Sequence, residues 1–334
     1  MKTINRREFN TIALGAAGLG LAGSLRPGLA SAQGLKELIV AEPVHQVGYL
    51  PLYVAIAKGY FKDEGLAVQV LTVESGAGHT NAVLTHQAFA FIGGPEHNAF
   101  AKAKGAEVRA IVNCVNRGNV YLVAVKGQSP KDRNFAAYMK GKRFATWFYG
   151  GTPNSISRYL LAEWGLDAKT DVVLTESGPS AILAAMKTRN ADVACITEPQ
   201  LTQGIRQGIW DEPFFNVPKE LGDYTYSTLN VLKETIDNDP KTCAGFVKAM
   251  MRGMKLTYEN PKEAVEIARK EFPTMALEDL TATVDRAFAD ELWSRDGKMA
   301  PQAWATGQRV VQKAGLLKID VPFKDVIDTR FAGL

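Results

Sequence analysis

Residues 38–100 read LIVAEPVHQVGYLPLYVAIAKGYFKDEGLAVQVLTVESGAGHTNAVLTHQAFAFIGGPEHNAF, and the expected architecture follows from this stretch. Three runs in it, residues 38–41, 66–73 and 88–92, are mostly apolar, and residues 66–73 alternate and are rich in β-branched side chains, as strands are. Each run is followed by a loop of small and polar residues and then by a segment that suits a helix. The stretch therefore predicts a strand, a loop and a helix, repeated three times.

The three loops occupy the same place in this predicted fold, because each follows the carboxyl end of a strand. They are residues 45–49, 74–79 and 93–97. The helix after the first loop has Pro51 in its first turn, where the missing N–H costs nothing, and it stops at Gly59. Ligands of open α/β sheets bind outside the carboxyl ends of strands, where helix N-termini present unpaired N–H groups. We therefore expect the three loops to form one wall of a binding site.

The middle of the chain repeats this order. Further strands are predicted at residues 143–147, 172–175 and 191–196, and each ends in a loop that contains Gly or Pro. By position, residues 176–178 (Glu-Ser-Gly) of the second set correspond to residues 74–76 (Glu-Ser-Gly) of the first. The repetition predicts an α/β protein with two similar lobes that face each other across a cleft.

The remaining segments fix the expected boundaries of the lobes. Two more strands, residues 108–115 and 120–125, complete the first part of the first lobe, and residues 224–232 return the chain to it. We expect the remainder of the chain, to residue 334, to be helical, with apolar spacing clearest at residues 243–256, 261–272 and 301–314. The predicted division is an export signal at residues 1–32, the first lobe at 33–125, the second lobe at 126–223, and a return to the first lobe with C-terminal helices at 224–334.

Residues 1–32 have the pattern of an export signal rather than of a folded segment. Arg6 and Arg7 precede a weakly apolar run rich in Gly and Ala, and residues 30–32 read Ala-Ser-Ala, a cleavage pattern. The paired arginines favour the twin-arginine route over the alternative, an ordinary secretory signal. We expect cleavage after Ala32 and a protein free in the periplasm.

The net charge and the cysteine pattern argue against a nucleic-acid partner and against a zinc site. The chain has a formal net charge of +4, and residues 1–32 carry four basic residues and one acidic residue, which leaves about +1 for the mature protein. A nucleic-acid partner is not expected on that charge. The three cysteines are widely spaced and form no zinc-binding pattern. We expect neither a metal nor a cofactor.

The segment AIAKGYFKDEGL, residues 55–66, carries a resemblance to a known family. Together with the Gly-x-Gly loop at residues 76–78 and the Ala-Asp-Val run at 191–193, it resembles the periplasmic substrate-binding proteins of ABC importers. It is most similar to the branch that serves nitrate, sulfonates, taurine and pyrimidine precursors of thiamine. The resemblance implies a two-lobed type II periplasmic binding fold that closes on one small ligand and then docks on a membrane permease with its ATPase. We expect a monomer.

The candidate ligand-binding residues are polar, aromatic or glycine residues in the loops that follow strands. Some have a purely structural alternative: Ser75 as a helix cap, Arg117 in a surface salt bridge and Glu198 in a structural ion pair. Tyr149 is the aromatic residue expected to stack on a planar ligand. The full set is His45, Gln46, Tyr49, Ser75, Gly76, His79, Glu96, His97, Asn116, Arg117, Tyr149, Gly151, Thr152, Ser177 and Glu198.

The supply of histidine, glutamate and aromatic residues favours an organic ligand, aromatic or heterocyclic or of the carboxylate or sulfonate type. Two other functions stay open: a periplasmic ligand sensor, and an enzyme like the pyrimidine synthases of the thiamine pathway, which share this fold. The spacings of a Ser-His-Asp triad, of HExxH and of a P-loop do not occur, and the cysteine-rich pattern of those synthases is missing. We therefore expect a binding protein rather than an enzyme.

Overall fold

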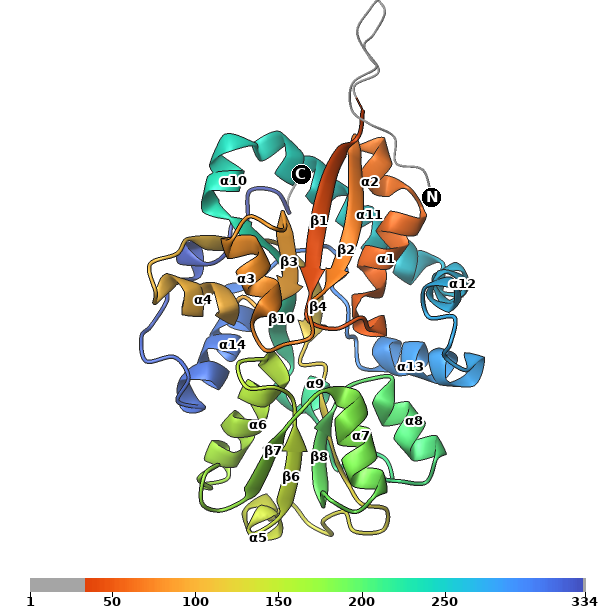
Figure 1. Cartoon of the computed structure of the whole chain (residues 1–334), viewed down its shortest axis with the longest axis vertical. Helices are drawn as coiled ribbons and strands as arrows, with labels where there is room; N and C mark the ends of the chain where they lie inside the picture. Colours follow the sequence, from red (N-terminus) through yellow and green to blue (C-terminus); the bar gives the residue numbers. More distant parts are fainter. Residues whose placement is uncertain (1–33, 333–334) are drawn as a thin grey trace, which may run out of the picture. The chain divides into compact units, whose positions relative to one another are not determined.

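The computed structural model describes residues 34–332 and contains two five-stranded sheets, each with helices packed on it (Figure 1). We call the first sheet with its helices the first lobe, and the second sheet with its helices the second lobe. The export signal predicted at residues 1–32 lies outside the described residues. Within residues 34–332, no helix combines the length and the apolar content needed to cross a membrane.

The first sheet has the strand order β2-β1-β3-β10-β4. β1 pairs in parallel with both β2 and β3, and β10 is inserted antiparallel between β3 and β4. The strands are β1 (Lys36–Glu42), β2 (Leu66–Thr72), β3 (Ala90–Gly93), β4 (Val108–Arg117) and β10 (Asp223–Leu232). The three strands predicted in the opening stretch are thus neighbours whose carboxyl ends lie at one edge.

The second sheet repeats the arrangement with the order β7-β6-β8-β5-β9. Here β6 pairs in parallel with β7 and β8, while β5 is antiparallel to β8 and β9. The strands are β5 (Tyr121–Ala124), β6 (Arg143–Thr146), β7 (Val173–Glu176), β8 (Val193–Ile196) and β9 (Phe215–Asn216). The same pattern of three parallel strands with an antiparallel fourth brings a second set of loops to one edge.

The chain passes from the first sheet to the second earlier than the sequence indicates. β4 ends at Arg117 in the first sheet, and β5 begins at Tyr121 in the second. A boundary after residue 125 therefore separates β5 from the sheet to which it is hydrogen-bonded. An apolar run alone does not say which sheet a strand will join, since buried strands of both sheets have the same composition.

The helices of the first lobe include three that follow its parallel strands and a layer formed by the C-terminal part of the chain. α11 packs on α1, and α3 lies against β1 and β3. The helices that come before the chain enters the second sheet are α1 (Leu50–Ala57), α2 (Tyr60–Asp63), α3 (Gly78–Leu84) and α4 (Glu96–Lys102), and η1 (Val47–Tyr49) is a 3-10 turn. The later ones are α10 (Lys233–Asn238), α11 (Pro240–Glu259), α12 (Pro261–Glu271), α13 (Leu277–Ala289) and α14 (Pro301–Lys313).

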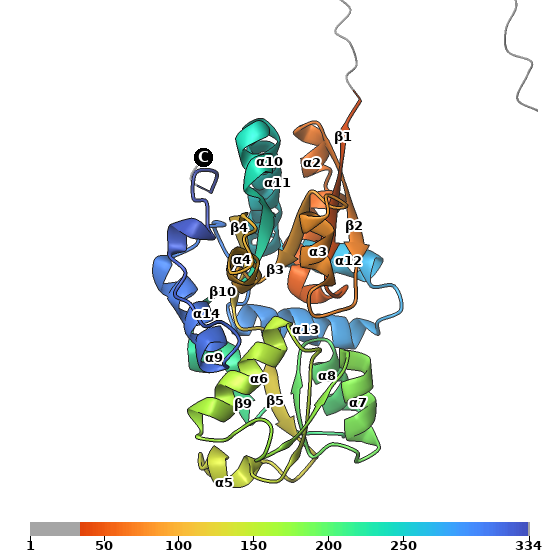
Figure 2. The ribbon, with the colours of Figure 1, turned by 60° about the vertical axis from the view of Figure 1, so that its left-hand side comes forward.

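Two of these C-terminal helices also contact the second lobe. α13 packs on α12 and on α8, and α14 packs on β10 and on α6 (Figure 2). The helices of the second lobe are α5 (Phe135–Met139), α6 (Thr152–Glu163), α7 (Pro179–Lys187), α8 (Gln200–Arg206) and α9 (Val217–Leu221). The connection between the lobes therefore consists of packed helices as well as crossing strands.

The helical prediction for the end of the chain is wrong beyond α14. From Ala314 to Ala332 the chain forms only the short 3-10 turn η2 (Phe323–Asp325), and it buries Leu317, Val321 and Phe331 against the first lobe. Pro322 and Gly315 interrupt this segment, and each disfavours a continuous helix.

Candidate ligand-binding site

Loops from both lobes enclose a small cavity at the edge where their parallel strands end. The first lobe contributes the loops after β1, β2 and β3, together with residues 226 and 227 of β10, and the second lobe contributes the loops after β6 and β8. If a water-sized sphere is moved through the cavity, its centre can reach a volume of about 30 Å³. Adding the radius of that sphere gives roughly 150 Å³ of total space. That is room for one small organic molecule.

Eight of the residues predicted from sequence line this cavity: Gln46, Tyr49, Ser75, Gly76, His79, His97, Gly151 and Thr152. Most of them are buried. Their positions follow from local structure, since η1 begins directly after Gln46, α3 begins just after Gly76, and α6 begins at Thr152. The side chain of Ser75 accepts a hydrogen bond at 2.6 Å from the amide of Gly78, the first residue of α3, although the N-cap residue of that helix is Ala77.

The two lobes touch at the rim of the cavity through their backbones. The α-carbon of Gly76, from the loop after β2, lies against the carbonyl of Tyr149 and near the amide of Gly151, both from the loop after β6. No side chain stands between the loops at this point. A glycine is required here because any larger residue would hold the lobes apart.

Several polar atoms in the cavity wall have no hydrogen-bond partner among the described residues. They are Oε1 of Gln46, both ring nitrogens of His79, Nε1 of Trp147 and Oγ1 of Thr197, and all of these side chains are buried. Buried polar groups in folded proteins are nearly always paired, and an unpaired one costs roughly 1–3 kcal/mol. The wall therefore offers both donors and acceptors to a molecule in the cavity.

The cavity wall has no charged side chain. Among the described residues that line it there is no Lys, Arg, Asp or Glu, and its only ionisable imidazoles are those of His79 and His97. Burial lowers the pKa of His97 to about 4, and burial together with the neighbouring His97 holds the pKa of His79 well below its usual range. Their rings meet edge to face with centroids 4.7 Å apart. Both imidazoles are neutral at neutral pH.

Glu96 lies behind this wall rather than on it. Its carboxylate is completely buried, folds over Gly94, and has no hydrogen-bond partner for either oxygen among residues 34–332. Burial raises the pKa of Glu96 to about 7, an effect that the side chain of Thr152 partly offsets. Glu96 is thus a buried carboxyl group in the first turn of α4, next to but not part of the cavity wall.

The structure places His45 away from the cavity. Its Nδ1 lies 2.9 Å from Oε1 of Glu42 and its Nε2 lies 3.5 Å from Oε1 of Glu271. The ring packs against Tyr53 and Phe272, with centroids 4.8 and 4.7 Å away. The hydrogen bond with Glu42 raises the pKa of His45. These contacts turn the side chain toward α12 while the next residue, Gln46, turns inward.

Asn116, Arg117, Tyr149 and Ser177 also lie outside the cavity. Arg117 forms ion pairs with Asp223 and Glu291, and Asn116 donates a hydrogen bond to the same Asp223. The side chain of Tyr149 is 60% exposed, with the guanidinium of Arg158 5.3 Å from its ring centroid. Ser177 extends the pairing of β6 and β7 through its amide, which donates to the carbonyl of Thr146.

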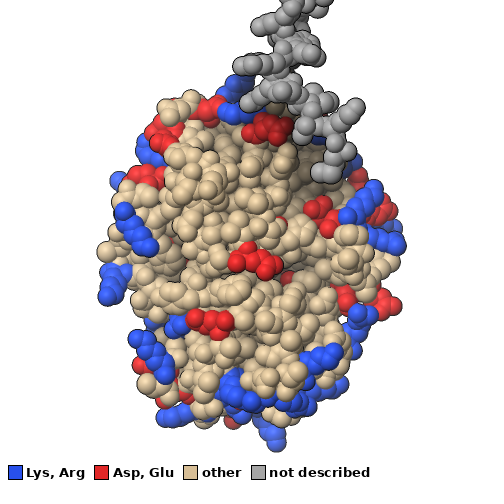
Figure 3. All heavy atoms as spheres, viewed as in Figure 1, with Lys and Arg blue, Asp and Glu red and all other residues tan. Residues whose placement is uncertain are grey.

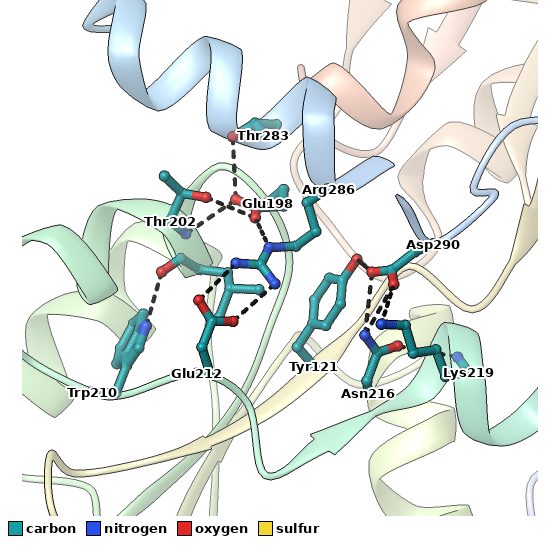
Figure 4. A network of polar contacts seen from close by, with 11 residues as sticks. Tyr121, Glu198, Thr202, Trp210, Glu212, Asn216, Lys219, Thr283, Arg286 and Asp290 are labelled. Carbon is teal, nitrogen blue, oxygen red and sulfur yellow. Dashed lines mark hydrogen bonds and ion pairs between the residues drawn. The ribbon is translucent and has the colours of Figure 1, made fainter. Parts of the chain in front are cut away.

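Glu198 belongs to a buried network that joins the second lobe to α13 (Figure 4). Its carboxylate accepts hydrogen bonds from the amide and hydroxyl of Thr202 at 3.1 and 2.8 Å, and from the hydroxyl of Thr283 at 3.2 Å. Nε of Arg286 donates to it at 2.9 Å. Burial raises the pKa of Glu198 despite these partners. Its geometry matches the structural ion pair and not a ligand contact.

A second group of contacts in the same network is centred on Asp290, which follows α13. Its carboxylate accepts a hydrogen bond from the hydroxyl of Tyr121 at 2.8 Å and from the side chain of Asn216 at 3.1 Å, and Lys219 lies 3.5 Å away (Figure 4). The network thus attaches β5, β9 and α9 of the second lobe to the end of α13.

The sequence analysis did not select the remaining residues of the cavity wall: Pro43, Val44, Gly93, Trp147, Phe148, Pro153, Thr197, Tyr226 and Ser227. Trp147 and Phe148 stand in the same aromatic run as Tyr149, and two-residue alternation along an extended segment would place Trp147 and Tyr149 on the same face, so it gave no signal that they differ in direction. Tyr226 and Ser227 lie within β10, and no local pattern distinguishes them from other strand residues.

The comparisons with known proteins agree on one family. A family model described as NMT1/THI5 like matches residues 46–264. YtlA of Bacillus subtilis, named as a binding protein, is 24% identical over 302 residues, which make up 89% of this chain and 89% of YtlA. The 4-amino-5-hydroxymethyl-2-methylpyrimidine phosphate synthase of Candida albicans is 24% identical over 269 residues, 75% of this chain and 74% of the synthase.

The comparison of structures identifies the fold. The alkanesulfonate-binding protein SsuA from Xanthomonas axonopodis pv. citri, solved bound to MOPS, superposes with a TM-score of 0.72 at 15% sequence identity. The match covers 89% of this chain and 100% of SsuA. The two lobes therefore have the generic fold of periplasmic binding proteins, as the sequence analysis predicts.

Proposed function

This chain belongs to the NMT1/THI5-like family, and from that premise we propose that it is the solute-binding component of an ABC importer. It captures one small organic molecule between its lobes and delivers it to a membrane permease that works with an ATPase. It acts as a monomer in the periplasm, where the signal at residues 1–32 directs it by the twin-arginine route.

The observation that carries this proposal is that both lobes supply walls of one cavity. His79 and Tyr49 come from the first lobe, and Trp147 and Thr152 come from the second. A molecule held there is in contact with both, so it stabilises the closed arrangement relative to an open one. A permease that distinguishes closed from open protein then receives only loaded copies.

The chemistry of the wall favours an uncharged, planar ligand with a single ring. Roughly 150 Å³ of space suits one substituted ring and is too little for fused rings with long substituents. Trp147 and Phe148 supply aromatic surface, and the unpaired groups of Gln46 and His79 suit ring nitrogens and exocyclic oxygens or amines. An anion would find no cationic side chain among the described residues that line the cavity.

The relative from Candida albicans makes an enzyme of the same family the second candidate. In this chain the cysteines at 114, 195 and 243 are all buried, and burial raises their thiol pKa values to about 12, about 11 and about 12. Reactive cysteines are instead partly exposed and have lowered pKa values. Because the three cysteines have neither property, we favour a binding protein over an enzyme that uses a reactive cysteine.

Isothermal titration calorimetry with two groups of compounds tests the proposal. The first group is uracil, cytosine and 4-amino-5-hydroxymethyl-2-methylpyrimidine, and the second is nitrate and ethanesulfonate. We expect at least one ring compound to bind with a Kd at or below about 1 μM, and both anions to bind at least about tenfold more weakly. Tight binding of an anion with no binding of the rings would reject the proposed ligand class, and conversion of a ring to a product would reject the binding-protein role.

The proposed export route has its own test. Replacing Arg6 and Arg7 by Lys removes the paired arginines while it keeps the charge of the segment. We expect the mature protein to disappear from the periplasmic fraction of the variant. An unchanged periplasmic yield would assign export to the ordinary secretory route.

A further inference from the structure

A second hollow lies outside the cleft, on the other side of His97. It is an open groove in which the centre of a water-sized sphere can reach about 560 Å³, against about 30 Å³ in the inner cavity, and it takes its lining from α3, α4, the segment after α14 and the loop after β6. His97 borders both the groove and the inner cavity. Apart from His97 the two linings share no residue: Gly76 and Gly151 line only the cavity, and Tyr149 and Gly150 line only the groove. The groove is therefore a separate space from the cavity that holds the proposed ligand.

The floor of the groove is apolar. It is formed by the side chains of Leu84, Phe100, Leu316, Leu317 and Ile319, and the side chain of Ile319 is 46% exposed. Figure 3, viewed from the same side as Figure 1, shows mostly uncharged atoms over the part of the face where α3 and α4 lie, with two acidic patches nearer the centre of the view. An apolar hollow with polar edges is a common mark of a binding site.

The charges at the groove have one sign. Lys104 and Lys318 line it, and neither forms an ion pair with a described residue. Neither Asp nor Glu is among the described residues of the lining. Two cationic groups thus border the same apolar hollow, and the described lining holds no acidic side chain beside them. The groove is thus complementary to a negative charge attached to an apolar body.

Two buried polar groups face the same space. Thr80 is 6% exposed and its hydroxyl has no hydrogen-bond partner among the described residues. The imidazole of His97 is likewise buried and neutral. Each can donate a hydrogen bond to an acidic or carbonyl oxygen. They add directional contacts to the non-directional attraction of the two lysines.

From the apolar floor, the two unpaired lysines and the buried hydroxyl of Thr80, we propose that this groove is a second binding site, for an amphipathic organic anion such as a medium-chain or aryl-substituted carboxylate. The site takes Tyr149 and Gly150 from the second lobe and the rest of its lining from the first. Its occupant contacts both lobes and therefore favours the closed arrangement. The site acts on closure whatever molecule the inner cavity binds.

Calorimetry on the mature protein tests the site with octanoate and 4-phenylbutyrate as probes, and with octylammonium as the probe of opposite charge. We expect saturable binding of both acids with one site per chain, and binding of octylammonium at least about tenfold weaker. Absence of saturable binding by both acids, or equal binding of octanoate and octylammonium, would overturn the proposal.

Variants locate the binding. The double variant Lys104→Gln and Lys318→Gln should weaken octanoate binding about two- to thirtyfold, as expected for the loss of two exposed charge contacts. The control, Lys187→Gln with Lys241→Gln, makes the same change of charge at exposed lysines outside the groove and should bind as the parent does. Equal affinity in both double variants would contradict a site at the groove.

One more variant separates this site from the inner cavity. Gln46→Ala changes the cavity wall but lies outside the groove, so octanoate should bind it unchanged. Loss of octanoate binding in Gln46→Ala would place the acid in the inner cavity and overturn the proposal. Failure of the ring compounds to bind the parent protein would instead contradict the proposed function and leave the proposal of a second site unaffected.

Discussion

Gly76 and Tyr149 meet across the cleft, backbone to backbone. A Cβ atom placed on Gly76 would stand 1.9 Å from the carbonyl oxygen of Tyr149 and 3.2 Å from the amide nitrogen of Gly151. A carbon atom cannot approach an oxygen so closely, so one of the loops must move. The contact between these two loops thus depends on the absence of a side chain at residue 76.

Replacing Gly76 with Ala should hinder closure without unfolding either lobe. We expect the ligand affinity to fall at least about tenfold, because closure contacts are lost while each lobe keeps its own core. Small-angle X-ray scattering with and without ligand should show a smaller decrease in the radius of gyration than in the parent protein.

Gly178→Ala is the matched control, since Gly178 also lies in a loop of the second lobe. A Cβ there would meet ring atoms of Phe148 at 3.4 Å, which is ordinary contact. This variant should close and bind as the parent does. If Gly76→Ala closes equally well, the contact between the loops does not limit closure.

The indole of Trp147 should donate a hydrogen bond to the ligand. Its Nε1 is buried in the cavity wall and has no partner among the described residues. Trp147→Phe keeps an aromatic ring and removes the donor, so we expect the ligand affinity to fall about tenfold, the effect of one lost hydrogen bond, with little change in the melting temperature.

Trp210 provides the comparison. Its Nε1 donates to the carbonyl of Leu201 at 2.9 Å, away from the cavity. Trp210→Phe should therefore lower the melting temperature and leave the ligand affinity unchanged. The reverse result, with affinity lost in Trp210→Phe and kept in Trp147→Phe, would show that the cavity wall is assigned to the wrong indole.

Glu198 should matter for stability rather than for affinity. It is the buried member of the ion pair with Arg286, and its loss leaves the partly buried guanidinium with Glu212 alone. We expect Glu198→Gln to lower the free energy of unfolding by about 3 kcal/mol, as breaking a buried pair does. Urea denaturation followed by circular dichroism measures this change.

Glu212→Gln removes the other partner of the same arginine. The side chain of Glu212 is 66% exposed, so its pair with Arg286 should contribute less than about 1 kcal/mol. Ligand affinity should be unchanged in both variants. A loss of affinity in Glu198→Gln at unchanged stability would restore Glu198 as a ligand-binding residue.

Glu96 should make the folded protein less stable as the pH rises. Burial raises its pKa in the folded protein to about 7, from an ordinary value of 4.5. Below pH 4.5 the carboxyl group of Glu96 is protonated in both the folded and the unfolded protein, so its ionisation does not lower the free energy of unfolding. Between the two values the unfolded chain has lost a proton that the folded protein keeps, so the free energy of unfolding falls, and above about pH 7 the loss is complete at roughly 3 kcal/mol.

Glu96→Gln removes this titration. The variant should gain stability over the parent as the pH is raised from 4.5 to 8, and the difference between the two should stop growing once the pH passes about 7. Urea unfolding at a series of pH values measures the difference. A constant difference across that range would show that Glu96 ionises normally in the folded protein.

The fold was largely predictable because its signals are local. Each short apolar run, each loop with Gly or Pro and each helix start can be identified within ten residues of sequence, as at Pro51 and Gly59. The partner of a strand is not local. β5 has the same apolar composition as β4, and its place in the second sheet depends on β8 and β9, which come about 70 to 90 residues later.

The loops of the candidate site were predictable for the same reason, but the directions of their side chains were not. Gln46 faces the cavity and its neighbour His45 does not, because Glu42, Glu271 and Phe272 hold the imidazole elsewhere. Glu198 turns away because Thr283 and Arg286, on a helix more than 80 residues further along the chain, supply its partners. Such long-range contacts have no signal in one sequence.

Native mass spectrometry of the protein isolated from the periplasm, with identification of the molecule released on denaturation, tests directly whether the cavity holds such a ligand. We expect one bound ring compound per chain, organic, uncharged and with a single ring, and we expect the Trp147→Phe variant to retain less of it. Release of nitrate, a sulfonate or a multi-ring compound instead, or equal retention by the variant, would rule out the proposed ligand.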